Sequence, residues 1–358
     1  MRASISFLAA LCALALSPFA AHTAFATQPA SGCGIPIDIH DGWAITSPEK
    51  QGMNPNLLCE MGDGITAGQL ANVDSIIVVR HGTLVYERYY VYRPHQFEFD
   101  STTRHQGYSM TKSVVSLLVG IAMERGLIKD IDAPVISYFP EGTELLAPGQ
   151  DRITLRHLLT MSAGLGSDRI PGVSFYYNNR ETELVGAVLN KVTGNNVEVL
   201  ARKEIFTPLG ISDIDWHKDA SSGLPMSARG LELRPRDWAK IGQLVLNRGV
   251  WEGKQIVPAS WIAQSTAEQI KADGPLSAEQ INADGPRSYG FQWWRGQSPG
   301  KKHPVQWIAA MGFNSQKTLI IPALDMVVVF NASLVSKNMV TPELDLLDRY
   351  ILPATSTD

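Results

Sequence analysis

A serine, a lysine and an apolar helix occur together in residues 107–120, and this stretch constrains the fold more than any other. If the helix begins near Met110, Ser109 and Lys112 lie about one turn apart and share a face. The residues that follow, 114–121, are apolar nearly all round, which is typical of a helix buried inside a domain. Burial lowers the pKa of a lysine, so a neutral amine could take the Ser109 proton. We therefore predict a nucleophile and its base at the start of a buried helix.

The Ser-x-x-Lys spacing also occurs at Ser47 and Ser298, so the motif alone is weak evidence. Both of those copies contain proline, which indicates turns rather than the start of a buried helix. The plain alternative at Ser109 is an ordinary helix cap followed by an exposed lysine, and the spacing by itself does not exclude it.

The N-terminal residues 1–26 have the pattern of a secretory signal peptide. Arg2 precedes an apolar stretch, and Ala24-Phe-Ala26 fits cleavage before Thr27. We therefore expect a periplasmic or secreted protein. No later stretch approaches the roughly 20 uninterrupted apolar residues of a membrane helix, so no stable membrane span is expected after cleavage.

Cysteine usage agrees with export. Cys12 leaves with the signal peptide, and we predict that the remaining pair, Cys33 and Cys59, forms a disulfide. The alternative is lipidation of Cys33, which follows Ala30-Ser31-Gly32, although the apolar signal core ends well before it.

The chain has 358 residues, of which 44% are hydrophobic and 18% charged, enough for a large core and two packed lobes. Its formal net charge is -4 and it has no strongly basic run, so we expect no nucleic-acid partner. The sequence does not predict the oligomeric state.

We predict an N-terminal lead-in at 27–70 and a single hydrolase-sized domain at 71–358, with an α+β fold. Strand-like runs near both ends would share one antiparallel sheet flanked by helices, with a helical lobe inserted at about 125–255. The predicted strands are 75–80, 83–90, 317–321 and 326–331, and the predicted helices are 55–60, 154–161, 181–193, 236–247 and 342–350.

A polar loop, Phe175-Tyr-Tyr-Asn-Asn179, follows Pro171-Gly172 and precedes a predicted helix, so it could project side chains toward Ser109. Two Tyr-x-Asn pairs overlap in it, Tyr176 with Asn178 and Tyr177 with Asn179, and the pattern does not choose between them. The structural alternative is a packed tyrosine with asparagines serving as turn or cap residues.

We predict no metal and no cofactor, because the histidines are scattered and none has a paired-ligand spacing such as His-x-x-x-His. A Ser-His-Asp hydrolase is disfavoured because no Gly-x-Ser-x-Gly elbow is present. His105, although near Ser109, is interpreted as a loop residue.

Together these pieces resemble the serine β-lactamase and penicillin-binding superfamily, particularly its class C-like esterases and 6-aminohexanoate-dimer hydrolases. The resemblance covers most of the mature chain. The matching marks are Ser109-Met-Thr-Lys112, ITLRHLLTMSAGL at 153–165, Phe175-x-Tyr177-Asn-Asn179, PLGI at 208–211, RPRDWAKIGQLVLNRGVWEGKQIVP at 234–258 and Tyr289-Gly-Phe-Gln-Trp293.

The resemblance implies that Ser109 is acylated and that Lys112 and Tyr177 move its proton. It favours the second Tyr-x-Asn pair, so Asn179 would contact Lys112 or the substrate amide. It also implies an antiparallel sheet with an inserted helical lobe and the site between them.

The family's third element, normally a lysine or histidine two residues before a glycine, falls at Ala310-Met-Gly312, where the cation is missing. The Phe313 N–H would still form the oxyanion hole with the Ser109 N–H, because backbone donors survive side-chain changes. Lys317 is the nearest alternative cation in sequence.

Two further departures concern loops. The segment between Leu165 and Pro171 is shorter than in these hydrolases, so pocket size does not transfer from them. Residues 267–275 recur with one difference at 278–286, which we interpret as an expanded surface loop.

The leading hypothesis is an exported serine hydrolase acting on a small ester or amide. The rival enzymes are a β-lactamase or a D-alanyl-peptide carboxypeptidase, and the non-enzymatic rival is a sensor domain that has lost turnover.

Overall fold

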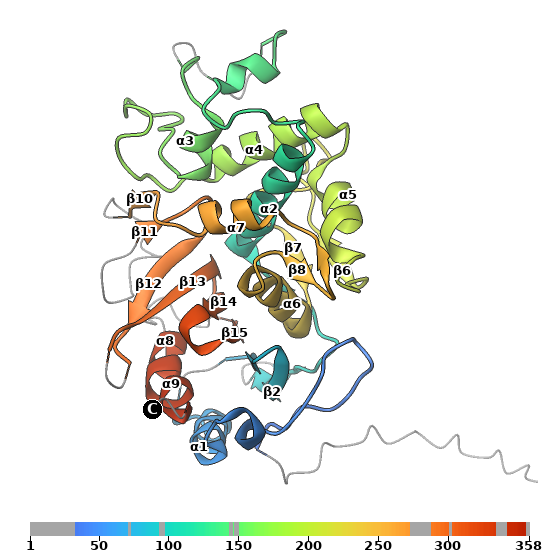
Figure 1. The fold of residues 1–358 in the computed structure, drawn as a ribbon, viewed down its shortest axis with the longest axis vertical. Helices are drawn as coiled ribbons and strands as arrows, with labels where there is room; N and C mark the ends of the chain where they lie inside the picture. Colours follow the sequence, from blue (N-terminus) through green and yellow to red (C-terminus); the bar gives the residue numbers. More distant parts are fainter. Residues whose placement is uncertain are drawn as a thin grey trace, which may run out of the picture. The chain divides into compact units, whose positions relative to one another are not determined.

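An eight-stranded antiparallel sheet, with strand order β10-β11-β12-β13-β14-β15-β1-β2, combines strands from both ends of the described chain (Figure 1). The computed structural model describes residues 33–70, 73–92, 97–142, 146, 150–272, 288–300, 303–333 and 342–355. These residues belong to one compact unit that begins at Cys33. The predicted signal peptide, 1–26, and most of the repeated segment, 273–286, lie outside the described residues.

The sheet confirms the predicted α+β class and the predicted pairing of terminal strands. A two-residue turn, His81-Gly82, joins β1 to β2 with both residues at positive φ (49° and 70°), as a tight hairpin requires. The sheet strands are β1 Ser75–Arg80, β2 Thr83–Tyr89, β10 Ile270–Lys271, β11 Ser288–Tyr289, β12 Trp294–Ser298, β13 Val305–Gly312, β14 Gln316–Ile321 and β15 Met326–Asn331.

Alternate residues of β1 point into two different cores, because successive side chains of a strand face opposite sides. Helices α2 (Thr111–Glu124) and α6 (Pro235–Leu246) contribute to the first core. Helices α1 (Pro55–Thr66), α8 (Pro342–Leu346) and α9 (Leu352–Ala354) contribute to the second. With both faces covered, β1 is buried along its whole length, which explains its continuous run of apolar residues.

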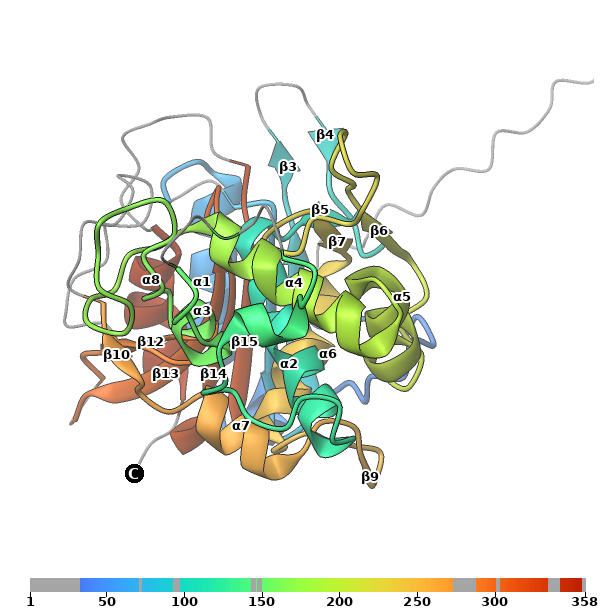
Figure 2. The same ribbon diagram turned by 90° about the horizontal axis from the view of Figure 1, so that it is seen from above.

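Helices α3 (Leu155–Leu159) and α4 (Asn179–Thr193) pack together, and α4 and α5 (Val197–Ala201) lie beside α2 (Figure 2). The predicted lobe at about 125–255 also included α6, and this assignment differs from the structure. Helix α6 packs on β14, β15 and β1 instead, and all of its residues except Leu246 are buried.

A second sheet has three strands in the order β5-β7-β6, and its first strand, β5, precedes α2 in the sequence. The strands are β5 His105–Gln106, β7 Leu231–Leu233 and β6 Ile214–Trp216. The interpretation of His105 as a loop residue was wrong. His105 pairs with Leu233 and its side chain is buried beside Phe99. A two-residue strand whose partner lies far along the chain leaves no local pattern to detect.

A hydrogen bond and an ion pair connect the lead-in segment to α6. The Trp43 Nε1–H donates to the Arg236 carbonyl (3.2 Å), and the buried Arg236 guanidinium pairs with Asp41 and Glu87. The disulfide predicted between Cys33 and Cys59 is present. Within the described ranges, no helix has the length and apolar character needed to span a bilayer.

The remaining elements extend or flank those already described. Helix α1 continues six residues beyond the predicted 55–60, and α8 continues through a wider helical turn at Leu347–Ile351. The other elements are β3 Val91–Tyr92, β4 Phe97–Glu98, β8 Val250–Trp251, β9 Lys254–Gln255 and α7 Ala259–Ser265.

Candidate active site

Ser109 lies in a short 3₁₀ turn, Tyr108–Met110, between β5 and the first residue of α2. Tyr108 has a φ of 46°, a left-handed conformation that costs a non-glycine residue about 1–3 kcal/mol. Gly107 approaches Trp238 so closely that a Cβ there would lie 2.1 Å from the indole ring. These constraints hold Ser109 at the N-terminal end of α2, where the helix dipole favours a developing negative charge.

Lys112 is 1% exposed and lies in the first turn of α2. Its Nζ lies 3.1 Å from Ser109 Oγ, 2.7 Å from Asn179 Oδ1 and 2.7 Å from the Ala228 carbonyl oxygen. A neutral amine has two N–H groups and one lone pair. If the two N–H groups donate to Asn179 and Ala228, the lone pair faces the Ser109 hydroxyl.

The charge state of Lys112 is set mainly by its surroundings. Burial lowers the pKa of Lys112 to about 7, while the Glu183 carboxylate opposes this shift and the Arg229 guanidinium adds to it. At neutral pH a large share of the Lys112 side chain is therefore an uncharged base.

The loop before α4 brings both members of the second Tyr-x-Asn pair to Lys112. The Lys112 ammonium nitrogen lies 5.0 Å from the Tyr177 ring centroid and donates to Asn179. Asn178 instead caps α4 by accepting from the Arg180 N–H, and the Tyr176 ring lies under the Arg169 guanidinium. The geometry therefore agrees with the pair that the resemblance favoured.

Aromatic packing holds the Tyr177 ring in place. It stacks on Trp294 with ring centroids 5.8 Å apart and meets Tyr289 edge-on at 6.4 Å. Phe175 packs against the same two rings. Such contacts restrict the orientation of the Tyr177 ring beside Lys112.

Strand β13 approaches the Ser109 turn from the sheet. A Cβ on Gly312 would lie 2.1 Å from the Gly107 carbonyl oxygen, so only glycine allows this approach. Phe313, just beyond the strand, meets the Tyr108 ring edge-on at 5.5 Å. Asn314 Nδ2 donates to the Tyr108 hydroxyl (3.3 Å). These contacts bring Gly312 and Phe313 beside the turn that carries Ser109.

The cation missing from β13 is not supplied by Lys317. Ala310 is buried and apolar. Lys317 lies on β14, is 4% exposed, and forms an ion pair with the fully buried Glu343 of the C-terminal helix α8.

Sequence reasoning missed the loop 226–230, which completes the surroundings of Lys112. The Glu183 carboxylate accepts from the Ser227 N–H (2.9 Å) and the Ala228 N–H (3.0 Å), and this fixes the carbonyl that Lys112 contacts. A contact through a backbone carbonyl leaves no residue-type signature, so no motif could have indicated it.

Glu181, in the first turn of α4, is a buried acid close to the site in sequence. Its carboxyl group accepts from the Ala163 N–H (3.3 Å) and the Gly164 N–H (3.2 Å). Burial raises the pKa of Glu181 to about 8. These bonds tie the loop after α3 to the helix that carries Asn179.

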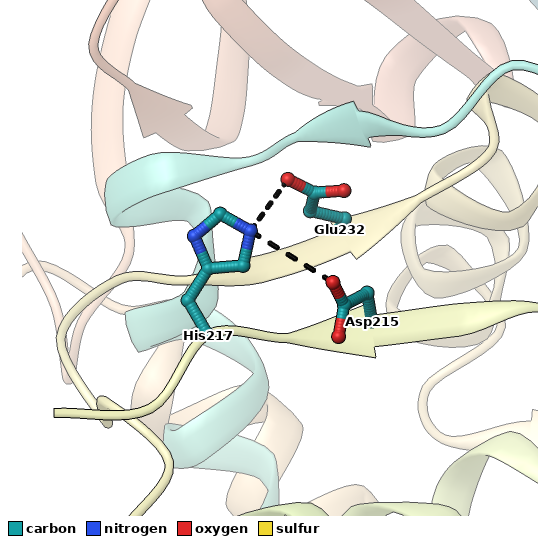
Figure 3. Close-up of side chains that lie close together, drawn as sticks. All are labelled: Asp215, His217 and Glu232. Carbon is teal, nitrogen blue, oxygen red and sulfur yellow. Dashed lines mark ion pairs between the residues drawn. The ribbon is translucent and has the colours of Figure 1, made fainter. Parts of the chain in front are cut away.

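One group of side chains in the described part of the chain could hold a metal ion: Asp215, His217 and Glu232 (Figure 3). Asp215 lies in β6 and His217 directly follows that strand. Glu232 lies on β7, directly opposite Asp215. His217 Nε2 is 2.8 Å from Glu232, which also lies 4.0 Å from Arg104 Nε. His217 lies beside both carboxylates and Glu232 also lies beside Arg104, so the group forms a network of polar contacts on β6 and β7 that does not include Ser109 or Lys112.

Comparisons with known proteins identify chains of similar sequence and fold. The chain is 23% identical over 307 residues to the 6-aminohexanoate-dimer hydrolase of Paenarthrobacter ureafaciens, covering 72% of this chain and 71% of that protein. It is 33% identical over 105 residues to the esterase EstB of Burkholderia gladioli, covering 28% and 26% of the two chains. The octameric penicillin-binding protein homologue from Pyrococcus abyssi has the same fold, with a TM-score of 0.62, 19% identity and coverage of 84% and 77%.

The family match covers both lobes and every residue described around Ser109. Residues 67–352 match the family described as Beta-lactamase, which extends from the end of α1 to α9. The two relatives named above are a 6-aminohexanoate-dimer hydrolase and an esterase. This chain therefore belongs to the β-lactamase family of serine hydrolases.

Proposed function

We propose that the protein is an exported serine hydrolase that cleaves a small ester or amide through an acyl-enzyme at Ser109. The observation that carries the proposal is the contact between a buried Lys112, with a pKa of about 7, and the Ser109 hydroxyl. It supplies a nucleophile and a neutral base in direct contact. Export to the periplasm or the medium rests on the pattern of residues 1–26.

In the acylation step, the neutral Lys112 amine takes the Ser109 proton while Oγ attacks the substrate carbonyl carbon. The developing oxyanion accepts hydrogen bonds from the backbone N–H groups of Ser109 and Phe313. Lys112 and Tyr177 then pass the proton to the leaving group, and the bond between the carbonyl carbon and that group breaks. Asn179 keeps Lys112 in place or receives the substrate amide.

In the deacylation step, a water molecule attacks the acyl carbon and loses a proton to the neutral Lys112 amine, directly or through the Tyr177 hydroxyl. The same N–H groups stabilise the second oxyanion. The proton returns to Ser109 Oγ as the acid product leaves, which restores the starting state. No metal, cofactor or nucleic-acid partner takes part.

Simple short-chain esters are proposed to be better substrates than penicillins and D-alanyl peptides. Those compounds carry a carboxylate that the family's third element usually helps to bind, whereas Ala310 has no charge and Lys317 pairs with Glu343. A lost charge-assisted hydrogen bond lowers transition-state binding by about 10 to 150-fold.

A fluorophosphonate probe followed by peptide mass mapping tests the nucleophile. We expect a single labelled residue, Ser109, and no labelling of Ser109→Ala. If another serine is modified, or if the variant is labelled like the parent protein, the assignment is wrong.

Comparison of kcat/KM for 4-nitrophenyl butyrate and nitrocefin on one preparation tests the substrate class. We expect ester turnover with weak or no nitrocefin hydrolysis. A kcat/KM for nitrocefin equal to that for the ester would favour a β-lactamase. Release of D-alanine from D-alanyl peptides with a higher kcat/KM than ester hydrolysis would favour a carboxypeptidase. Stoichiometric labelling without turnover on an ester and amide panel would favour a sensor domain.

A further inference from the structure

Arg229 stands beside the proposed base on an exposed part of the loop 226–230. The preceding residue, Ala228, accepts a hydrogen bond from Lys112 Nζ at 2.7 Å. Consecutive Cα atoms are only about 3.8 Å apart, so the Arg229 backbone begins within one residue of that contact. An arginine side chain that starts here lies within reach of a substrate bound at Ser109.

The loop that carries Arg229 is held from both sides. The Met226 N–H donates to the His217 carbonyl (3.0 Å), and the His217 N–H donates to the Gly230 carbonyl (2.9 Å). Helix α4 packs so closely on the loop that a Cβ on Gly186 would lie 1.9 Å from Ser227 Oγ. The backbone of the loop that carries Arg229 is therefore held in a fixed position.

The Arg229 guanidinium has no carboxylate partner within ion-pair distance among the residues that the structure describes. Its Nε instead lies 3.4 Å from the thioether sulfur of Met226, a weak acceptor. The nearby Glu183 carboxylate is occupied by the backbone N–H groups of Ser227 and Ala228. A strong, planar hydrogen-bond donor is thus left facing solvent beside Lys112.

The positive charge of Arg229 acts on Lys112, because it adds to the effect of burial in lowering the Lys112 pKa. Arg229 follows Ala228, whose carbonyl contacts Lys112, whereas β13 packs against the turn at Gly107 and Tyr108. The site has therefore lost the family's cation on β13 and carries an unpaired one on a different side.

We propose that Arg229 is a specificity residue that binds a carboxylate on the substrate, so that the protein prefers anionic esters or amides, such as half-esters or half-amides of dicarboxylic acids. Arginine suits this role because its guanidinium binds a carboxylate through two parallel hydrogen bonds. The inference rests on the proposed Ser109 hydrolase activity and adds the substrate class to it.

The test compares substrates that differ only in terminal charge. Mono-4-nitrophenyl adipate and 4-nitrophenyl hexanoate have acyl chains of equal carbon number and the same leaving group, and differ by a carboxylate in place of a methyl group. The 4-nitrophenyl ester of 6-aminohexanoic acid supplies the cationic counterpart. Because a ratio of kcat/KM values on one enzyme cancels changes in Lys112 basicity, the readout is the adipate-to-hexanoate ratio.

We expect this ratio to fall about 10 to 100-fold in Arg229→Gln, mainly through KM. Arg229→Lys should retain part of the preference, and Arg229→Glu should turn it toward the aminohexanoate ester. A third ester, 3-carboxy-4-nitrophenyl hexanoate, carries the carboxylate on the leaving group. A fall confined to this compound would still support a carboxylate site, placed on the leaving-group side.

Arg248→Gln is the matched control, since this exposed arginine follows the far end of α6, about 15 Å along the helix from Trp238, which contacts Gly107. Its ratio should equal that of the parent protein. If Arg229→Gln leaves kcat/KM for both the adipate ester and the 3-carboxy-4-nitrophenyl ester unchanged relative to 4-nitrophenyl hexanoate, with Ser109 still labelled and hexanoate still hydrolysed, the inference is overturned and the hydrolase proposal stays intact. Loss of labelling and of all ester hydrolysis in the parent protein would instead overturn the hydrolase proposal.

Discussion

The pH dependence of ester hydrolysis is the most direct consequence of a buried Lys112. The ordinary lysine pKa of 10.5 is lowered to about 7, mainly by burial. The protonated form cannot act as a base, so activity should be lost as pH falls through about 7. The neutral fraction is about one half at pH 7, one tenth at pH 6 and one hundredth at pH 5. We therefore expect kcat/KM to fall about tenfold per pH unit below pH 6 and to level off above pH 8.

The assay follows 4-nitrophenyl butyrate hydrolysis from pH 5 to pH 9 at constant ionic strength, with Ser109→Ala as the blank at each pH. Two variants move the midpoint in opposite directions. Glu183→Gln removes a charge that raises the Lys112 pKa, so its midpoint should shift to lower pH. Arg229→Gln removes a charge that lowers the Lys112 pKa, so its midpoint should shift to higher pH.

Lys112→Arg provides the matched control, because arginine keeps the positive charge and does not deprotonate in this range. It should show no activity plateau at any pH tested. A midpoint above pH 9 in the parent protein, or the same midpoint in both charge variants, would refute Lys112 as the titrating base.

Three further predictions follow from the geometry. Tyr177→Phe should lower the acylation rate about 100-fold or more, measured by probe labelling, and full activity would remove Tyr177 from proton transfer. Gly312→Ala should lower kcat about 100-fold with a native circular dichroism spectrum, because its Cβ would lie 2.1 Å from the Gly107 carbonyl oxygen; unchanged kcat would argue against an oxyanion donor after β13. Replacing Cys33 and Cys59 with serine should lower the free energy of unfolding by about 3.5 kcal/mol, given a sequence separation of 26 residues, and a loss below about 1 kcal/mol in urea titration would contradict this.

Much of the fold could be predicted because its signals are local. The runs at Ser75–Arg80 and Met326–Asn331 are rich in β-branched residues, and both form central strands. Gly194 ends α4 in a left-handed conformation with φ of 70°, as a glycine after a helix indicates. The contact between Ser109 and Lys112 followed from helical spacing alone.

Other parts of the site depend on contacts between distant segments. The Ala228 carbonyl reaches Lys112 across 116 residues, and a backbone acceptor is the same in every residue type. The left-handed conformation of Tyr108 occurs in a residue that rarely adopts it, so the sequence predicts the opposite. The role of Gly312 becomes visible only when β13 and the turn at Gly107 are seen together.

The place of β15 between β14 and β1 also limits the order in which the chain can fold. Ser75 of β1 pairs with Asn331 of β15, 256 residues later. Because the chain is synthesised from its N-terminus, the β1–β2 hairpin is made long before its partner strand β15. Strand β1 carries apolar residues on both of its faces. Pairings this distant in sequence form slowly, and unpaired strands of this kind associate with other chains. The sheet order thus means that the central part of the sheet can form only after β15 has been made.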